Sequence, residues 1–525
     1  MLIENAMEIY HRIAQKTLFV LKKQPAFSYI TAAIILFLSS EIYRQVAVPK
    51  HLRPFARVSF LSLVRSFMRK DSVVERNKKL IAPIVNQGHK VYVAKLPFEW
   101  SLSIADSELA KMVLLKSDMF PKSQDFRNKL GEDNIIVRFM GSENVALANG
   151  HKWKKQRKFM NPAFHRSMPI NTFGNLMFRL FDRIDEQPHD FPVSIRLKNF
   201  TLDALGLAAF DFDFKALLGD PDGWTKTYDT IMKSLFDPWI FLFSNIDFIL
   251  QAILPSRRQS TAAVIKFNKM LIDMAERRRQ EIQRGEKKAV PDNEKDLLTL
   301  LIEADLEEGN TATNDELREN IALFFLAGHD TTGNALSFCL YNLAKNKHVQ
   351  DKLREEIVSV MNDRDPDAIP TAEDFKKMPY LNMVIKENLR LSGPVDRLFS
   401  RVTTEDIVME GHVVPKGTYI NVDIASLHFN PNYWHDPQSF IPERFEDDGE
   451  HSHHAGMTWL PFSNGSRQCL GMNFSLTEQR VFLAMLLKRY VVDISKDSIH
   501  YDKVVYDKLF NFAPASLTLN FTKRQ

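Results

Sequence analysis

The spacing of apolar residues predicts that most of this chain is helical. Between Lys152 and about Asp363, apolar residues recur at helical intervals, and polar stretches such as residues 284–296 interrupt them. Two further helical stretches are expected around residues 60–68 and 73–85. The pattern therefore favours a mainly α fold.

A small β region is predicted at two places. The stretches HKVYVAKL (residues 89–96) and EWSLSIAD (residues 99–106) are short and alternating, and they carry β-branched and aromatic side chains. They predict a pair of strands. Short strands with turn signals return between Phe399 and Val422, so sheet is present but minor.

The organisation predicted for the chain is one large unit behind a short leading segment. No Gly/Ser-rich linker and no repeat divides the 525 residues, so we expect a single domain over residues 49–525. With 45% hydrophobic residues and 39 phenylalanines, this domain can bury a large core around an apolar cavity. The net charge of +4 is too small to indicate a nucleic-acid partner.

The leading segment, residues 1–48, is expected to be a membrane anchor. Residues 24–40 form a stretch of 17 residues without a charge, at the short limit of what spans a bilayer. No convincing cleavage site follows, so a retained anchor is favoured over a signal peptide. An interfacial amphipathic helix is the alternative, because residues 2–21 mix apolar and basic residues. Basic residues flank the stretch on both sides and leave the orientation open, but only two cysteines in the chain favour a body in the reducing cytosol.

One of the two cysteines, Cys469, lies in the loop PFSNGSRQCLG, just before an apolar helical pattern. The positive end of that helix would stabilise a thiolate. Gly465 permits a turn, Gly471 leaves room for a flat group, and Arg467 adds a cation for an anion on that group. No second cysteine lies nearby to make a zinc site, and no local signature of a catalytic nucleophile appears. A thiolate bound to haem iron fits best, and a small buried core cysteine is the alternative.

This loop resembles the haem-binding signature of the cytochrome P-450 superfamily, the haem-thiolate monooxygenases. Phe462, Gly465, Arg467, Cys469 and Gly471 match all five fixed positions. The resemblance extends over about residues 50–520 and implies the family's mainly helical fold with a small β region. It implies Cys469 as the axial ligand of haem iron.

A second motif of the family, LAGHDTT at residues 326–332, lies in a helix predicted to start at the capping box Thr313-x-x-Glu316 and to end near Lys345. A mid-helix Gly328 and a threonine weaken such a helix, so a groove that holds dioxygen is one interpretation and a kinked core helix is the other. The resemblance implies that Asp330 and Thr331 relay protons to the bound oxygen.

Two more motifs complete the resemblance. In ENLR, Glu387 and Arg390 are three residues apart on one helical face and can pair, with Arg444 of PERF as a third member. Both the residues themselves and the resemblance to the family indicate that these three residues have a structural role. In HKWKKQRKF, Trp153 and Arg157 lie at i and i+4; alone they indicate a solvated basic helix.

The resemblance implies that Trp153 and Arg157 contact a haem propionate, and that Arg401 stands where the family keeps another basic residue for it. It also implies an NADPH-dependent reductase as electron donor, with cytochrome b5 as a possible second one, and haem b as cofactor. Five further cations are expected to face an acidic redox partner near the thiolate: Lys154, Lys155, Lys158, Lys488 and Arg489.

The activity expected is insertion of one oxygen atom into an apolar substrate, at the endoplasmic reticulum membrane with the catalytic domain facing the cytosol. The stretches NPAFHRS and SNGSRQCLG resemble those of fungal members which hydroxylate steroids or related lipids. A haem-thiolate isomerase or dehydratase is one rival; such relatives tend to lack the acid and alcohol that Asp330 and Thr331 supply. A non-catalytic haem or lipid carrier is another.

The expected walls of the substrate cavity are residues 125–145, 323–327, 395–398 and 509–512. In this set Asp396 and Arg397 are unusually polar. They either bind a polar end of the substrate or pair with each other at the surface, and the second interpretation is preferred.

Overall fold

The computed structural model describes residues 31–524 apart from 34, 37, 38, 41, 42, 44, 45, 70, 97, 98, 236, 238–250, 252, 287–290, 308, 310, 311, 362, 363, 366 and 507–512. It divides into two compact units, Met1–Arg53 and Pro54–Gln525. Most of the expected membrane stretch, residues 24–40, lies outside the described part, as does the expected cavity wall 509–512. Within the described part, no helix has both the length and the apolar character to cross a bilayer.

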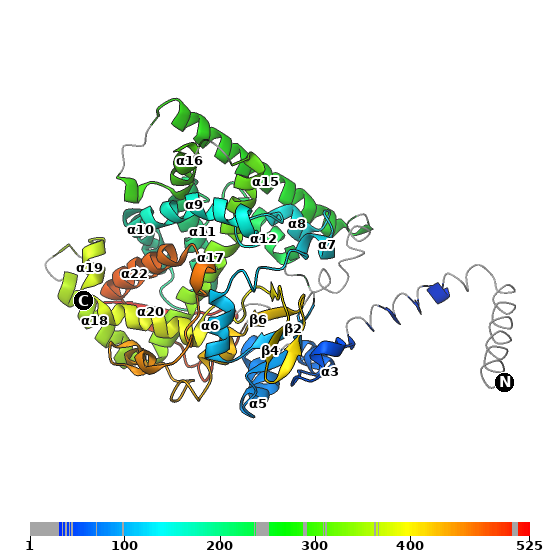
Figure 1. The fold of residues 1–525 in the computed structure, drawn as a ribbon. Helices are drawn as coiled ribbons and strands as arrows, with labels where there is room; N and C mark the ends of the chain where they lie inside the picture. Colours follow the sequence, from blue (N-terminus) through cyan, green and yellow to red (C-terminus); the bar gives the residue numbers. More distant parts are fainter. Residues whose placement is uncertain are drawn as a thin grey trace, which may run out of the picture. The chain divides into compact units, whose positions relative to one another are not determined.

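Helices make up most of the second unit, as the apolar spacing predicted (Figure 1). Those before residue 300 are α3 (Phe60–Met68), α4 (Val73–Arg76), the π-helical turn η2 (Asn77–Ile81), α5 (Ala82–Val85), α6 (Ser107–Leu115), α7 (Phe126–Leu130), α8 (Ile135–Met140), α9 (Gly150–Arg166), α10 (Ile170–Glu186), α11 (Val193–Phe210), α12 (Trp224–Leu235), α15 (Pro255–Gln283), η4 (Asp292–Glu294) and α16 (Leu297–Glu307). Those after it are α17 (Asn314–Lys345), α18 (Lys347–Met361), α19 (Ala372–Lys376), α20 (Pro379–Ser392), α21 (Ile424–His428), η5 (Pro442–Phe445), η6 (Glu450–His453), η7 (Gly465–Arg467) and α22 (Met472–Arg489). The first unit contributes the turn η1 (Lys50–Leu52).

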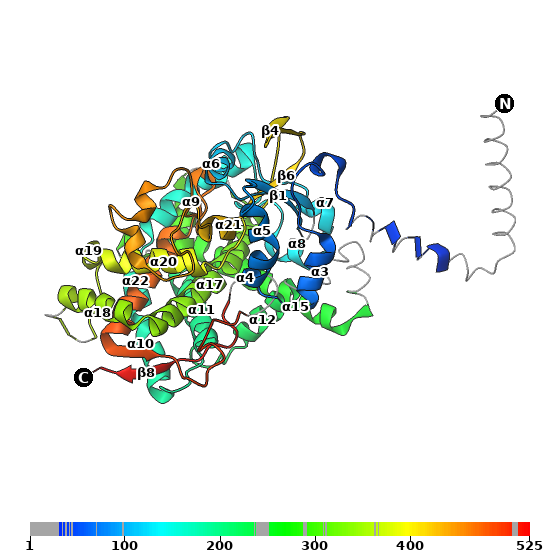
Figure 2. The same cartoon turned by 90° about the horizontal axis from the view of Figure 1, so that it is seen from below.

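The β region is small and lies beside α5 (Figures 1 and 2). Its main sheet has the order β1-β2-β6-β3, and two hairpins, β4–β5 and β7–β8, stand apart from it. The predicted pair forms the antiparallel hairpin β1–β2, and β2 runs parallel to β6. The strand bounds are β1 (Val91–Lys95), β2 (Trp100–Ile104), β3 (Arg401–Val402), β4 (Ile407–Met409), β5 (His412–Val414), β6 (Tyr419–Val422), β7 (Tyr490–Asp493) and β8 (Asn520–Lys523).

Helix α17 crosses the core and is about 48 Å long at 1.5 Å per residue. Its capping box is formed as predicted: the Glu316 N–H donates to Thr313 Oγ1 at 3.1 Å, and the Thr313 N–H donates to Glu316 Oε2 at 3.0 Å. The mid-helix Gly328 serves close packing, because an added Cβ would lie 3.1 Å from Leu205 of α11. This glycine faces a neighbouring helix and so does not itself mark a groove.

Arg397 is turned into the main sheet, which contradicts the preferred surface pairing with Asp396. Its Nη2 donates to Tyr92 Oη at 3.0 Å and lies 3.8 Å from Asp423 Oδ2. Tyr92 Oη in turn donates to Asp423 Oδ2 at 2.6 Å. The sheet edge, rather than a surface pair, therefore holds this guanidinium.

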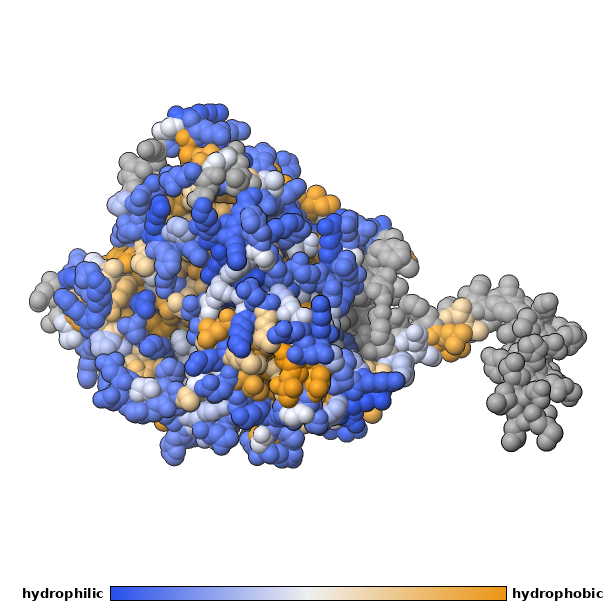
Figure 3. Space-filling view, viewed as in Figure 1, coloured by the Kyte–Doolittle hydropathy of each residue, from blue (hydrophilic) through white to orange (hydrophobic). Residues whose placement is uncertain are grey.

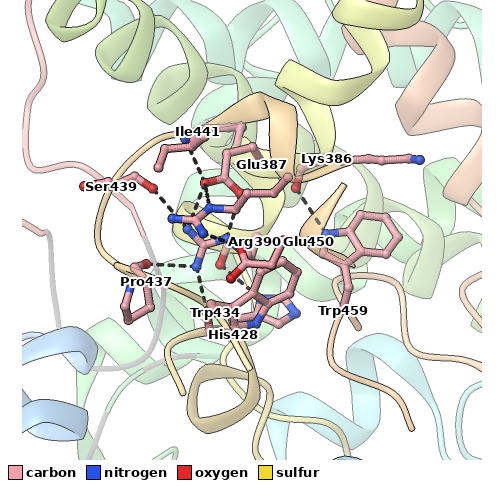
Figure 4. A network of polar contacts seen from close by, with 12 residues as sticks. Lys386, Glu387, Arg390, His428, Trp434, Pro437, Ser439, Ile441, Glu450 and Trp459 are labelled. Atoms are coloured by element: carbon pink, nitrogen blue, oxygen red, sulfur yellow. Dashed lines mark hydrogen bonds and ion pairs between the residues drawn. The ribbon is translucent and has the colours of Figure 1, made fainter. Parts of the chain in front are cut away.

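Glu387 and Arg390 of α20 form a fully buried ion pair, as their spacing predicted (Figure 4). Arg390 Nε and Nη2 donate to the two Glu387 oxygens at 2.7 and 2.8 Å. The remaining Arg390 N–H groups donate to backbone oxygens of His428, Pro437 and Ser439. Such complete pairing is what makes a buried guanidinium tolerable.

Arg444 joins this network, as predicted for the third member. Its Nε lies 3.3 Å from Glu387 Oε1, and its Nη1 pairs with Glu450. The negative charges of two carboxylates therefore cancel the positive charges of two guanidiniums within this network. The network fixes η5 and η6 against α20.

The same network reaches the segment before the cysteine loop. His428 Nε2 accepts the Leu460 N–H at 2.9 Å, so its Nδ1 carries the proton and donates to the Arg390 carbonyl at 3.0 Å. Burial, with the positive charge of Arg390, lowers the pKa of His428 to about 3 and keeps the ring neutral. Trp459 Nε1 also donates to the Lys386 carbonyl at 3.1 Å (Figure 4). Residues 459 and 460 are thus tied to α20.

We predict that Glu387→Gln lowers the free energy of unfolding by about 3–5 kcal/mol, because the buried Arg390 loses its carboxylate partner and Arg444 keeps only Glu450. Chemical denaturation measures the change. Glu443→Gln is the matched control: Glu443 pairs with Lys352 at the surface and should cost less than about 1 kcal/mol. Equal effects of the two substitutions would contradict the structural role of Glu387.

Candidate functional site

The loop that carries Cys469 is a tight turn ahead of α22. The Cys469 N–H donates to the Phe462 carbonyl at 3.0 Å, which closes the loop. Gly465 has φ +72°, and an added Cβ there would lie 2.9 Å from the Leu114 carbonyl, so both its conformation and its surroundings require glycine. At Gly471 the nearest atom to an added Cβ is Phe164 Cε1 at 4.0 Å, which leaves open space beside the loop.

The surroundings of the Cys469 thiol indicate an enclosed hollow beside it. Its side chain has accessible surface, yet burial raises its pKa, while the Gly471 N–H and the Arg157 cation act in the opposite direction. An accessible group that is nevertheless desolvated borders an enclosed space. Cys339, by contrast, is buried in α17, and burial raises the pKa of its thiol far above the usual value. The two thiols therefore have different surroundings.

Helix α9 brings its aromatic and cationic residues to this loop. Arg157 Nη1 donates to the Gln468 carbonyl at 3.1 Å, next to Cys469. The Arg467 guanidinium lies 3.9 Å from the Trp153 ring centroid, a cation–π contact. Trp153, Arg157 and Arg467, which the sequence singled out separately, are therefore neighbours.

Arg401 and Lys122 complete a group of cations around Arg467. Arg401 begins β3 and donates from Nη1 to the Phe120 carbonyl at 3.0 Å. Burial lowers the pKa of Arg401 to about 10 and that of Arg467 to about 10, and repulsion from Arg401 and Arg157 adds to the shift of Arg467, while Asp118 opposes it. Lys122 belongs to no motif in the sequence, and its Nζ donates to the Phe399 carbonyl at 3.3 Å.

Asp330 and Thr331 are adjacent on α17 but have different partners. Thr331 Oγ1 donates to the Ala327 carbonyl at 2.6 Å. Asp330 Oδ1 lies 3.1 Å from Lys198 Nζ and 3.7 Å from His329 Nε2. Burial works to raise the pKa of Asp330, but these two neighbours hold it below its usual value. Lys198 lies outside the motifs, and His329, although it stands inside LAGHDTT, was given no role by the sequence.

The stretch of α17 around Thr331 borders open space although most of the helix is buried. Ala327, one turn before Thr331, is exposed, and Leu326 and Thr331 are partly exposed. The next residue, Thr332, contacts Ser475 of α22 through their hydroxyl groups at 3.0 Å. Helix α17 therefore meets the helix that follows Cys469 beside these residues.

Two of the five expected docking cations lie elsewhere. Lys488 and Arg489 end α22, about 25 Å along the helix from its start beside the cysteine loop. Lys488 donates to the Asp365 carbonyl, and Arg489 pairs with Asp185 and Asp367. Their assignment to the thiolate side is wrong, because a helix of this length carries its last turn far from its first.

Comparison with known proteins identifies the family. The family model described as Cytochrome P450 matches residues 75–505. Cytochrome P450 4F12 of Homo sapiens is 29% identical over 374 residues, which cover 68% of this chain and 71% of that protein. Cytochrome P450 4F6 of Rattus norvegicus is 30% identical over 370 residues, which cover 67% of each chain.

Solved structures confirm the fold. The crystal structure of the cytochrome P450DA heme domain matches with a TM-score of 0.71 at 19% identity, covering 90% of this chain and 98% of that one. A triple mutant of the same heme domain matches with a TM-score of 0.73 at 20% identity. At this level of sequence identity, the similarity shows only that the helices and strands are arranged alike. It agrees with the mainly helical architecture that the apolar spacing predicted.

The family assignment accounts for the desolvated thiol at the start of α22, the ring of cations beside it and the long helix that passes the hollow. It brings with it a haem cofactor, electrons from a reductase and an apolar substrate. The chain belongs to the cytochrome P450 family and is a haem-dependent monooxygenase.

Proposed function

We propose that the Cys469 thiolate would bind the iron of a haem b, and that Phe462, Gly465 and Gly471 shape the loop around it. The observation that carries this proposal is the Cys469 thiol, accessible from a hollow yet desolvated, at the start of α22. A helix N-terminus and the nearby Arg157 both favour a thiolate. The open space beside Gly471 suits the approach of a flat ring.

The cations around Arg467 fit the two carboxylates of haem b. Among the described residues, the hydrogen bonds of Arg467 and Arg401 go to carbonyl and amide oxygens and none goes to a carboxylate. Mutual repulsion of desolvated cations is costly unless an anion joins them. We assign Arg467, Arg401 and Arg157, with Trp153 packed against Arg467, to this cofactor.

Thiolate-bound haem supplies the activation of dioxygen. Asp330 and Thr331 of α17 would supply the protons that the reaction of dioxygen consumes. Asp330 is ionised at neutral pH because its pKa is lowered, so it can accept a proton from water. Thr331 holds a hydroxyl proton beside the exposed Ala327, and a water molecule between the Asp330 and Thr331 side chains would complete the relay.

We predict that Cys469→Ser abolishes the long-wavelength Soret band of the reduced, carbon monoxide-treated protein, because oxygen replaces sulfur at the iron. Absorption spectroscopy of haem-loaded protein measures it. Cys339→Ser is the matched control and should retain the band, because Cys339 is buried away from the hollow. A band that survives in the Cys469 variant would sink the assignment.

We predict that Thr331→Ala raises the share of electrons lost as hydrogen peroxide by about tenfold, because one positioned proton donor is removed. The measurement compares NADPH consumed, peroxide released and product formed. Thr331→Ser keeps the hydroxyl and should stay close to the unchanged protein. Equal coupling in all three proteins would remove Thr331 from the mechanism.

The electron donor in this proposal is an NADPH-dependent flavoprotein reductase, with cytochrome b5 as a possible second donor. Lys154 and Lys158 are exposed on α9, the helix whose Trp153 and Arg157 reach the cysteine loop. Cations on that helix steer an acidic partner toward the site.

Residues 1–48 act in this proposal as an anchor in the endoplasmic reticulum membrane, with residues 49–525 as the catalytic domain in the cytosol. Exposed apolar side chains on the second unit support contact with lipid: Leu61 and Met68 of α3 are 72% and 79% exposed. Val408 and Val413, paired across the β4–β5 hairpin, are 69% and 58% exposed, and Figure 3 shows an apolar area there.

We predict that the full chain sediments with membranes after a wash in alkaline carbonate, because an inserted segment resists conditions that strip peripheral proteins. Immunoblots of the pellet and supernatant measure it. A peripheral membrane protein in the same sample is the control. Complete release of the chain by carbonate would contradict a spanning anchor.

The substrate proposed is a steroid or related lipid. The support is that the accessible residues Leu326 and Ala327, next to Thr331 on α17, are apolar. The experiment is a screen of steroids, fatty acids and polar compounds by difference spectroscopy. Binding by polar compounds alone would contradict this substrate class.

A further inference from the structure

Two histidine rings pack against the buried ion-pair network that holds the segment before the cysteine loop. His451 of η6 stacks on the Trp434 ring, with centroids 5.8 Å apart and an angle of 11° between the planes. His454, which directly follows η6, meets the same ring edge to face at 4.5 Å, and the two histidine rings are 5.7 Å apart. Trp434 is completely buried, so both histidines lie against the interior.

Trp434 joins these histidines to the network. The Arg390 guanidinium lies 5.0 Å from the Trp434 ring centroid, a cation–π contact. Figure 4 shows Arg390, Trp434 and His428 together, and His428 is close enough to His451 for their charges to repel. The three histidines His428, His451 and His454 therefore surround one tryptophan and one guanidinium.

A positive charge added to these rings has no free carboxylate to pair with. The carboxylates of the network, Glu387 and Glu450, already pair with Arg390 and Arg444. Glu450 attracts a charge on His454, but Arg444 and the exposed His453 repel it. The charged and titratable groups that face the three rings are Lys386 of α20, Glu387, Arg390, Tyr433, Arg444 of η5, Glu450 and His453.

Burial keeps the three rings neutral at neutral pH. It lowers the pKa of His451 to about 4, and repulsion from His454 and Lys386 adds to the shift. Burial also lowers the pKa of His454, and it lowers that of His428 to about 3. A segment released from the network would bind protons with the ordinary histidine pKa of about 6.5. Release is therefore favoured increasingly as the pH falls from about 6.5 toward 4.

His428 links this cluster to the cysteine loop. Its Nε2 accepts the Leu460 N–H at 2.9 Å, and its Nδ1 donates to the Arg390 carbonyl, so a second proton on the ring breaks the bond to Leu460. Leu460 lies two residues before Phe462, whose carbonyl accepts the Cys469 N–H at 3.0 Å. Protonation of His428 therefore frees the strand of chain that closes the cysteine loop.

We propose that His428, His451 and His454 form an acid-sensitive switch: when they bind protons together, residues 459 and 460 leave α20 and the cysteine loop no longer presents its sulfur. The inference rests on the proposed function of Cys469, because the switch acts on the position of that residue. The rings give up their protons when the pH returns to neutral, so the switch is reversible. The histidines thereby control the enzyme without taking part in its chemistry.

The first test follows the thiolate Soret band of the reduced, carbon monoxide-treated protein between about pH 7.5 and 4.5, a range that covers the ordinary histidine pKa. The band should disappear with a steepness of about three protons per molecule. His451→Phe and His454→Phe keep a ring against Trp434 but cannot be protonated. Each should move the midpoint to lower pH and reduce the steepness by about one proton.

The matched control for the first test is His453→Phe. His453 is an exposed histidine of the same turn, and its replacement should leave the midpoint close to that of the unchanged protein. If His451→Phe and His454→Phe both keep the profile of the control, the proposal is overturned.

The second test changes a charge without changing the rings. Lys386→Gln removes a cation that repels a proton on His451, so the band should persist to lower pH in one respect and be lost at higher pH in none. With the repulsion gone, the folded protein tolerates the charged ring better, and the midpoint moves down. Lys376→Gln is the control, because Lys376 pairs with Glu373 at the surface. Equal midpoints in the two lysine variants would reject the electrostatic coupling.

The third test observes the Leu460 amide directly. Hydrogen exchange of peptides from residues 456–468, read by mass spectrometry and corrected for the intrinsic effect of pH, should speed up as the pH is lowered from about 7 to 5. His428→Gln carries an amide that can accept from Leu460 and donate to the Arg390 carbonyl but does not titrate, so this variant should stay protected. Protection that is independent of pH in the unchanged protein would overturn the proposal.

A return to neutral pH should restore both the Soret band and the protection of Leu460. Irreversible loss of both would show acid unfolding in place of a switch and would also overturn the proposal.

The outcomes distinguish the switch from the proposed function. If the thiolate band survives in Cys469→Ser, the proposed ligand falls, and hydrogen exchange at Leu460 still decides whether the histidines titrate as described. If Cys469→Ser loses the band while Leu460 stays protected in acid, the ligand stands and the switch falls.

Discussion

The buried pair of Glu387 and Arg390 is the interaction on which the position of the cysteine loop depends. It lies more than 70 residues before Cys469 in sequence, yet it holds the carbonyls of His428, Pro437 and Ser439, and His428 holds Leu460. The loop then needs only its own short turn to present the sulfur. A charged pair without a chemical role thereby determines where the chemistry takes place.

The ionisable groups near the Cys469 sulfur lower the stability of the fold and favour the binding of a ligand. Cys469, Arg467 and Arg401 are all desolvated, and burial works against the charged form of each. Such groups are costly to bury, and in the proposed site a bound anionic cofactor would offset that cost. The surrounding scaffold has to be rigid to keep them in place, and the fully bonded Arg390 supplies part of that rigidity.

Much of the fold could be predicted from local sequence. The capping box at Thr313 and the alternation in β1 and β2 are short-range signals, and each element formed where expected. The pairing of Glu387 with Arg390 followed from helical spacing in the same way.

Contacts between segments that are far apart in sequence could not be predicted from local patterns. Arg397 points into the sheet because it contacts Tyr92 and Asp423 there. These two residues lie some 300 and 26 residues away in sequence. Lys488 and Arg489 follow Cys469 by about 20 residues in sequence, but α22 carries them to its far end. Lys122 carries no motif, and only the fold brings it to Arg467.

The glycines of α17 limit how this enzyme can adapt to molecules of different size. An added Cβ at Gly328 would lie 3.1 Å from Leu205, and one at Gly333 would lie 3.0 Å from Thr201 Oγ1, so α11 and α17 are in near backbone contact. Neither helix can move toward the other to enlarge the opposite side. Room for a bulkier substrate therefore cannot come from a closer approach of these two helices.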